Sequence, residues 1–306
     1  MAAPLDLWER PQAQETVMIA GWEQWADAGS ISSGLPYYII EQSEARKIGQ
    51  IGPDGYYLFQ IPGTHHLLRP VVKLDEGLVR SMSSPTNEFY YADRGNLGLL
   101  IFAGDEPHMN EDAYADAILD AAEQTGVRRI IALGGVYGSM PYDKERSVSC
   151  SYSLPHMQAE MENYAVRFSN YEGGTTISTF LVHKAAQRGM EALSFHGFVP
   201  AYDFGQTAFA SQGLRIENDF KAWYDLVRRI NHMFGVGIDV SHLREQADEL
   251  AASMESQLDE LAREMPQLNV RAYLAEVSKE FVEHPFMPLD DVWAEGLGDI
   301  FGDLGD

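Results

Sequence analysis

Two short apolar runs with a helix-like segment between them constrain the fold of this sequence most. Residues 97–102 form a continuous apolar run, which is typical of a strand buried on both faces of a parallel sheet. Residues 112–125 have small apolar side chains on one side of a predicted helix, and Gly126 is placed to end it. Residues 129–133 repeat the buried-strand pattern and stop at two glycines. Such units in succession predict an α/β fold with a parallel sheet and right-handed crossovers.

Weaker signals of the same kind extend this pattern towards both ends. Further strands are expected at residues 16–20, 71–79, 89–91 and 192–198, and helices at residues 30–42, 156–168 and 175–188. Either Asp27 or Ser30 is available to cap the first helix. Residues 48–61 contain two β-prone pieces around Gly52-Pro53-Asp54-Gly55, a sequence suited to a tight turn. We therefore expect at least four buried strands and a hairpin at 48–61 that projects from the core.

The sequence beyond Gly235 is helical in character. One apolar stripe ends at Pro266 and a second follows at Val270, Leu274, Val277 and Phe281; the first consists of Leu243, Ala247, Leu250, Met254, Leu258, Leu261 and Met265. Residues 289–306 form an acidic tail interrupted by glycines, which we expect to be ordered only when bound. The predicted organisation is an α/β core domain over residues 1–234 with a hairpin insertion near 48–61, and a helical C-terminal segment with an acidic tail over 235–306.

Charge and cysteine content limit the partners. The chain has 46 acidic against 22 basic residues and a formal charge of −24, so phosphate backbones and anionic lipid would repel it. Neither nucleic acid nor a membrane is expected as a partner. Cys150 is the only cysteine, so no intramolecular disulfide is possible, and no signal peptide is visible near the start. A cytoplasmic location is expected.

Acidic and aromatic residues gather in the loops that follow the predicted parallel strands. The carboxyl ends of such strands meet at one crevice, where carboxylates can act as general bases, metal ligands or receptors for amines. The alternatives are that Asp27 is a helix cap and that Trp22 and Trp25 pack beneath the loop. The candidate ligand-binding residues are Trp22, Glu23, Trp25, Asp27, Asp105, Glu106, Gly135, Tyr137, His196 and Tyr202.

Established catalytic signatures are absent from the sequence. It contains no P-loop, no dinucleotide-binding glycine motif after the first strand, no G-x-S-x-G and no H-E-x-x-H. Cys150 lies in an alternating strand-like stretch and is expected to be a packed side chain, and the adjacent His65 and His66 would face opposite ways on a strand. His196 ends a predicted strand and is either catalytic or, more commonly for a lone histidine, structural. No catalytic residue, metal or cofactor is therefore assigned.

An ordered series of segments resembles the proteasome assembly chaperone 2-like family, in its actinobacterial branch. The matching pieces are GWEQWADAG at 21–29, GDEP at 104–107, LGGVYGSMPYDKERSV at 133–148 and FHGFVPAYDF at 195–204. The resemblance implies a three-layer α/β sandwich similar to nucleoside phosphorylases and related hydrolases, with a mostly parallel central sheet. It also implies a hairpin insertion used in oligomerisation, a homotrimer, and a helical C-terminal part over a ligand site. Some relatives dock through a C-terminal hydrophobic-tyrosine-any-residue signature, whereas this sequence reads Leu304-Gly305-Asp306 there, with glycine in place of tyrosine.

Two classes of function follow from these observations. The first is an assembly-chaperone-like protein that binds other protein chains, with a ligand pocket at the strand ends under a helical lid. The second is a small-molecule hydrolase or phosphorylase-type enzyme that uses the acidic loop residues.

Overall fold

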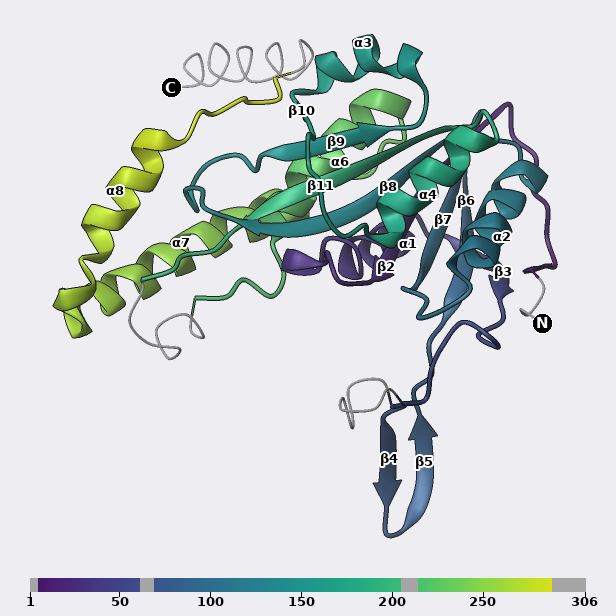
Figure 1. Cartoon of the computed structure of the whole chain (residues 1–306), viewed down its shortest axis with the longest axis horizontal. Helices are drawn as coiled ribbons and strands as arrows, with labels where there is room; N and C mark the ends of the chain where they lie inside the picture. Colours follow the sequence, from purple (N-terminus) through teal and green to yellow (C-terminus); the bar gives the residue numbers. More distant parts are fainter. Residues whose placement is uncertain (1–4, 61–68, 205–213, 288–306) are drawn as a thin grey trace, which may run out of the picture.

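The centre of the molecule is a mixed nine-stranded sheet with helices on both faces, as Figure 1 shows. The computed structural model describes residues 5–60, 69–204 and 214–287. The strand order is β1-β3-β6-β7-β2-β8-β11-β9-β10. The strands are β1 (Leu5–Leu7), β2 (Glu15–Glu23), β3 (Arg46–Ile51), β6 (Asn87–Arg94), β7 (Leu97–Asp105), β8 (Val127–Gly138), β9 (Val148–Tyr152), β10 (Arg167–Phe168) and β11 (Glu191–Pro200).

Four adjacent strands, β7, β2, β8 and β11, run parallel and form the middle of the sheet. They coincide with the four apolar runs that the sequence contains. Their middle residues are buried on both sides of the sheet, so each strand reads as an unbroken apolar stretch. The antiparallel partners β6 and β9 flank this group. The predicted three-layer α/β sandwich is therefore confirmed.

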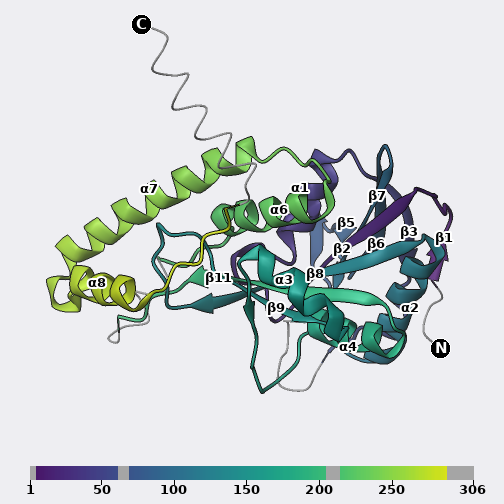
Figure 2. The same ribbon diagram turned by 90° about the horizontal axis from the view of Figure 1, so that it is seen from above.

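Helices cover the two faces of the sheet as separate layers, which Figure 2 shows from above. One core cluster packs α1, α6 and the C-terminal helices against one face, and a second packs α2 and α4 against the other. The helices are α1 (Gly34–Gln42), α2 (Glu111–Gln124), α3 (Gln158–Met161), α4 (Ile177–Gln187), α6 (Phe220–Phe234), α7 (Ser241–Glu264) and α8 (Val270–Glu280), with short 3-10 turns η1 (Ala28–Ser30), η2 (Pro155–Met157), η3 (Glu162–Tyr164) and η4 (Pro266–Leu268).

The hairpin predicted at residues 48–61 is wrong. Residues 46–51 form β3, which pairs with β1 and β6 in the main sheet. The chain then turns, with the Tyr56 N–H donating to the Pro53 carbonyl, and Tyr56 is buried against the ring of Tyr114 on α2. Within the described residues, the second β-prone piece thus places Tyr56 in the core and does not pair with the first piece, whereas its Phe59 is 63% exposed.

The projecting hairpin lies later in the chain, in β4 (Val72–Asp75) and β5 (Leu78–Met82). Figure 1 shows it extending well away from the sheet. Its turn is Glu76-Gly77, and both residues have positive φ, as the tight two-residue turns of β-hairpins require. The single strand predicted at residues 71–79 is therefore split in two by this turn.

The helix predicted at residues 156–168 is also wrong in extent. Only Gln158–Met161 is α-helical, and Ala165, in the left-handed conformation, ends the following 3-10 turn before β10 begins. The C-terminal prediction is closer, since α7 buries Leu243 and Leu258, and α8 buries Leu274 and Val277, in the same core cluster as the main domain. The division into domains at residue 234 stays a prediction. The predictions for His65, His66 and the tail 289–306 lie outside the described residues.

Candidate functional site

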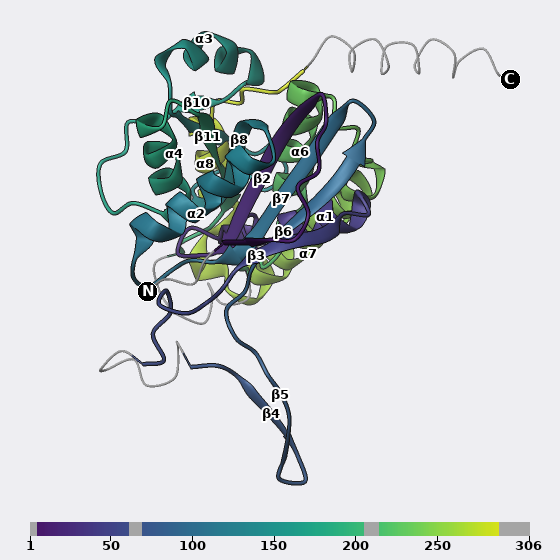
Figure 3. The same ribbon diagram turned by 90° about the vertical axis from the view of Figure 1, so that its right-hand side faces the viewer.

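The carboxyl ends of β7, β2, β8 and β11 meet at one edge of the sheet. Figure 3 shows β2 and β7 side by side at the centre of the sheet. The helix after β2, α1, packs on one face and the helix after β7, α2, packs on the other. Neighbouring parallel strands whose connections leave towards opposite faces form the crevice where α/β proteins bind ligands.

Glu23 and Asp105 stand opposite each other at the ends of β2 and β7. Burial raises the pKa of each carboxyl above its usual value, and the Asp105 charge raises the pKa of Glu23 further. Asp105 Oδ2 accepts a hydrogen bond from the Thr86 backbone N–H at 2.7 Å. The Tyr37 ring on α1 lies close enough for both carboxylates to contribute to its raised pKa, after burial as the main cause. We call Glu23 and Asp105 the acidic pair.

Asp27 acts as a cap for the start of the next turn of chain. Its Oδ1 accepts from the backbone N–H groups of Ser32 at 2.8 Å and Ser33 at 2.9 Å. These bonds favour the ionised form, yet burial is the larger effect and raises the pKa of Asp27. Asp27 also bridges to Gly135 of β8, where a Cβ atom would lie 2.1 Å from the Ala28 carbonyl oxygen. Glycine is needed there for the close approach of two backbones.

Glu106 connects two segments of the chain through hydrogen bonds. Its Oε2 accepts from the Trp25 backbone N–H and its Oε1 from the Ile177 backbone N–H, each at 3.0 Å. Ile177 is the first residue of α4, so the carboxylate sits at a helix N-terminus, where negative charge is favourable. The Trp25 side chain points outwards and is 71% exposed.

Two of the candidate aromatic residues lie in the core. Trp22 is fully buried on the α2 side of the sheet, and its Nε1 donates to the Tyr114 hydroxyl at 3.1 Å. Tyr202 is buried after β11, where its hydroxyl donates to the Met140 carbonyl at 2.9 Å. Trp22 therefore packs beneath the loop, as the alternative interpretation had it, and Tyr202 is held in the same manner.

His196 is separate from the acidic pair. It lies on β11 facing α4, with Nδ1 3.1 Å from the Ser194 hydroxyl and Nε2 3.4 Å from the Ser178 hydroxyl. Burial lowers its pKa to about 4, so the ring is neutral at pH 7. Ser178 is fully buried, which leaves its hydroxyl closed to a substrate. Tyr137 is half-exposed further along the edge, and its hydroxyl accepts from Arg215 Nε at 2.8 Å.

The arrangement therefore brings Glu23 and Asp105 together, with Asp27 near enough for its charge to raise the pKa of Glu23, and leaves His196 and Tyr137 apart. Within the described ranges, no three His, Cys, Asp or Glu side chains are grouped as a metal site would require. No helix of the described chain is long and apolar enough to cross a membrane.

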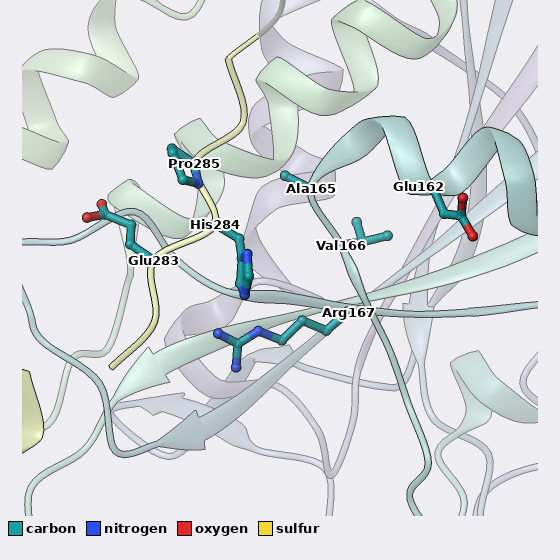
Figure 4. Close-up of a pocket in the computed structure, with 7 residues that line it drawn as sticks. All are labelled: Glu162, Ala165, Val166, Arg167, Glu283, His284 and Pro285. Carbon is teal, nitrogen blue, oxygen red and sulfur yellow. The ribbon is translucent and has the colours of Figure 1, made fainter. Parts of the chain in front are cut away.

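A pocket of about 360 Å³ lies elsewhere, between the segment after α3 and the chain after α8 (Figure 4). None of the ten candidate residues lines it; its lining is Glu162, Ala165, Val166, Arg167, Glu283, His284 and Pro285. Sequence reasoning missed both this pocket and the apolar surface of the β4–β5 hairpin. For the hairpin, the signal was present in Asp75-Glu76-Gly77 between two alternating runs.

Comparisons with known proteins point to one family. The family model described as the PAC2 family matches residues 21–258. A PAC2 family protein from Streptomyces avermitilis is 25% identical, with a TM-score of 0.67 over 85% of this chain and 99% of that one. A proteasome-assembly chaperone homologue from Mycobacterium tuberculosis is 21% identical, with a TM-score of 0.67 over 78% and 94%. An archaeal proteasome activator from Pyrococcus furiosus is 20% identical, with a TM-score of 0.58 over 83% and 98%. No curated protein matches significantly.

Proposed function

We propose that this chain, which belongs to the PAC2 family, is a non-catalytic protein of the assembly-chaperone type that forms a homo-oligomer and binds other protein chains. The observation that carries this proposal is the apolar surface of the β4–β5 hairpin, which no described part of the chain covers. The comparison with a proteasome-assembly chaperone homologue supports the same class of function.

The hairpin has one apolar and one mostly polar face. Alternation along β4 puts Val72 and Leu74 on the same side, where they pair with Met82 and Val79 of β5; the register shift between these pairs leaves Arg80 as an extra residue on β5. All four side chains are about half exposed or more. The other side carries the Lys73–Ser81 pair.

Such a hairpin needs a partner. A two-stranded ribbon is at best marginally stable alone in water, and this one buries none of its own residues in the monomer. A second copy of the chain is the occupant that we propose, because every copy carries the same projecting apolar face and a symmetric assembly would cover all of them. The trimer implied by the family resemblance is the proposed stoichiometry.

The oligomer is tested by light scattering coupled to size-exclusion chromatography. The variant Leu74→Lys/Val79→Glu places an opposite-charge pair on the apolar face and keeps the hairpin register. The matched control, Lys73→Glu/Ser81→Lys, makes an equivalent change on the other face. We expect wild type and control to be trimers and the first variant to be a monomer. A wild-type monomer, or a first variant with wild-type mass, would contradict the proposal.

Proteasome core subunits are the proposed first clients, on the strength of the chaperone homologue. The test is native mass spectrometry of the purified chain mixed with unassembled core subunits from its own organism. A discrete complex is expected with wild type. The same experiment is repeated with the hairpin charge variant. Loss of the complex would show that client binding requires the oligomer. Absence of any complex would remove the proteasome from the proposal.

A small-molecule binding site at the acidic pair is the second candidate. Its support is the raised pKa of two facing carboxyls at a strand-end crevice, an arrangement suited to a cationic or hydroxyl-rich ligand. Glu23 is the better probe, because its partly desolvated side chain still reaches solvent and caps no described backbone group. A thermal-shift screen of nucleosides, amino acids, amines and divalent metals should give a hit that Glu23→Gln abolishes. A panel without hits, or hits that survive the substitution, would reject this candidate.

The proposed lid over such a ligand consists of α7 and α8. Tyr273 of α8 packs edge-on against Tyr202, which follows β11, with ring centroids 6.1 Å apart. If the helices close over a ligand, amide hydrogen exchange in residues 241–280 should slow when the ligand is added. Unchanged exchange would show that these helices are ordinary packing.

A further inference from the structure

The chain leaves α8 as an extended strap, residues 281–287, which returns to the body of the molecule (Figures 1 and 2). Phe286 is its only buried residue, at 2% exposure, whereas Val282 and Met287 are each 61% exposed. Near its start, the Val282 carbonyl accepts a hydrogen bond from Arg167 Nη2 at 2.8 Å. The strap is thus anchored mainly by one aromatic side chain.

The Phe286 ring enters a site made of aromatic and cationic groups. The His232 ring is edge-on to it at 5.6 Å between centroids, and the Tyr164 ring lies at 6.3 Å. The guanidinium carbons of Arg229 and Arg228 lie 5.0 and 5.8 Å from the ring centre, within the range of cation–π attraction. This surrounding is selective for an aromatic ring over an aliphatic side chain.

Charged side chains also form hydrogen bonds with the backbone of Phe286. Its N–H donates to Glu145, at 3.0 Å from Oε1 and 3.1 Å from Oε2, and its carbonyl accepts from Arg228 Nη2 at 3.0 Å. A donor and an acceptor on one residue are the groups that an extended peptide presents from any chain. The site therefore recognises features that are independent of the strap's connection to α8.

The site holds its shape through contacts that do not involve the strap. Arg229 pairs with Glu145 at 2.7 Å, donates from Nε to the Tyr164 carbonyl at 3.0 Å and is itself fully buried. Three of the groups around Phe286 are thereby fixed to one another. Removal of the strap would leave a preformed cleft, and preformed sites bind with a smaller ordering cost.

Between its two anchors the strap spans the 360 Å³ pocket and packs loosely. Figure 4 shows the strap residues Glu283, His284 and Pro285 on one side of this pocket and Arg167 on the other. The ion pair of Glu283 with Lys144, at 3.5 Å, joins two half-exposed side chains and holds the strap weakly.

We propose that Tyr164, Arg228, Arg229, His232 and Glu145 form a recognition site for an aromatic residue in an extended protein segment, and that Phe286 occupies it as an exchangeable ligand from the same chain. A segment of another protein with an aromatic residue displaces the strap and binds in its place. The strap competes at the high effective concentration of a tethered ligand, so it makes the site selective for strong or abundant partners. This inference is separate from the hairpin interface and does not rest on it.

The test uses a fluorescent peptide with the sequence of residues 282–287, in which Phe286 is the only phenylalanine, and measures its anisotropy with full-length protein. In the variant Phe286→Ala the tethered ring is missing, so the peptide should bind at least about tenfold more tightly than to wild type. A peptide that carries alanine in place of Phe286 should not bind. In the Phe286→Ala background, Arg228→Gln should weaken binding, whereas Arg263→Gln, on the exposed side of α7, should leave it unchanged.

Two results would overturn the proposal. One is a peptide that binds neither protein, and the other is a peptide that binds wild type and Phe286→Ala equally or without its own phenylalanine. If Phe286→Ala does not fold, hydrogen exchange of wild type decides the question. Saturating peptide should speed exchange of the Phe286 amide, and an unchanged rate would show that the strap is a fixed part of the structure.

Discussion

The strand-end loops and the β4–β5 hairpin differ in whether their side chains have partners within the chain. At the strand ends, the carboxylates of Asp27, Asp105 and Glu106 accept hydrogen bonds from the chain's own backbone N–H groups. On the hairpin, the apolar side chains of Leu74 and Val79 are uncovered. Buried polar groups cost free energy when unpaired, and exposed apolar surface costs free energy when uncovered. These three strand-end carboxylates have partners within the chain, whereas no described residue covers the apolar face of the hairpin, and this contrast supports the proposed protein interface.

The largest expected change in the free energy of unfolding comes from breaking a buried ion pair, and an exposed ion pair on the hairpin serves as the comparison. Arg146 and Asp219 are both buried and lie 2.8 Å apart, whereas Arg80 and Asp75 of the hairpin are more than half exposed at the same distance. Asp219→Ala should lower the free energy of unfolding by about 3–5 kcal/mol, because an unpaired guanidinium remains buried. Asp75→Ala should cost less than about 1 kcal/mol. Urea denaturation measures both, and similar losses would contradict the contrast.

The pH dependence of stability provides the next test. Burial raises the pKa of Asp225 to about 6 from 3.8, so its stabilising contribution is complete below pH 3.8 and is lost as the pH rises through 6. Asp225→Asn keeps an acceptor for the Arg146 backbone N–H, which donates to Oδ2 at 2.7 Å. Between pH 4 and 7 the wild type should lose about 2–2.5 kcal/mol relative to this variant. Parallel curves would show that Asp225 does not titrate in this range.

Glu106 tests whether a strand-end carboxylate is structural. Glu106→Ala removes the acceptor for Trp25 and Ile177 and should lower the free energy of unfolding by about 1–3 kcal/mol. The control Glu111→Ala, in the exposed first turn of α2, should cost about 0.3–1 kcal/mol. If Glu106→Ala were neutral or stabilising, the carboxylate would be held for a ligand and not for the fold.

The smallest predicted effect is a gain in stability, whereas the other substitutions to alanine lower it. Glu23→Gln removes one of two like charges that face each other across β2 and β7, so it should stabilise the protein by about 0.2–1 kcal/mol at pH 7. The gain should vanish in acid, where both carboxyls are protonated. A loss of stability at pH 7 would show that Glu23 has a favourable partner and would remove the electrostatic argument for a ligand at the acidic pair.

Much of the core could be predicted from the sequence, because apolar runs and helix periodicity report burial directly. The runs at β7 and β8 identified the parallel centre, and parallel register then brought Glu23 beside Asp105. The errors arose where a residue is buried without being paired in a strand or included in a helix. Tyr56 looked like a strand residue and instead fills a core position, and the left-handed Ala165 ends a segment whose composition favours a helix.

The remaining features depend on contacts between distant parts of the chain, which no local pattern contains. The engagement of Glu106 with the start of α4 joins residues 71 positions apart. The alternation of Val72, Leu74 and Val79 indicates an amphipathic hairpin, but only the structure reveals that no described part of the chain covers it. Phe286 likewise reads as one of several apolar residues in 281–287 until Glu145 and Arg229 are seen around it.

The most direct test of the hairpin interface is the labelling rate of a single introduced cysteine. The only native cysteine, Cys150, is buried and burial raises its pKa to about 12, so it should not compete for a maleimide. Val79→Cys places a thiol on the apolar face of the hairpin, and Tyr171→Cys places one in the loop after β10; the two native side chains are 55% and 68% exposed in the monomer. The account predicts that labelling at position 79 is slow in concentrated protein and accelerates on dilution, while labelling at position 171 is fast throughout. Equal, concentration-independent rates at both positions would contradict it.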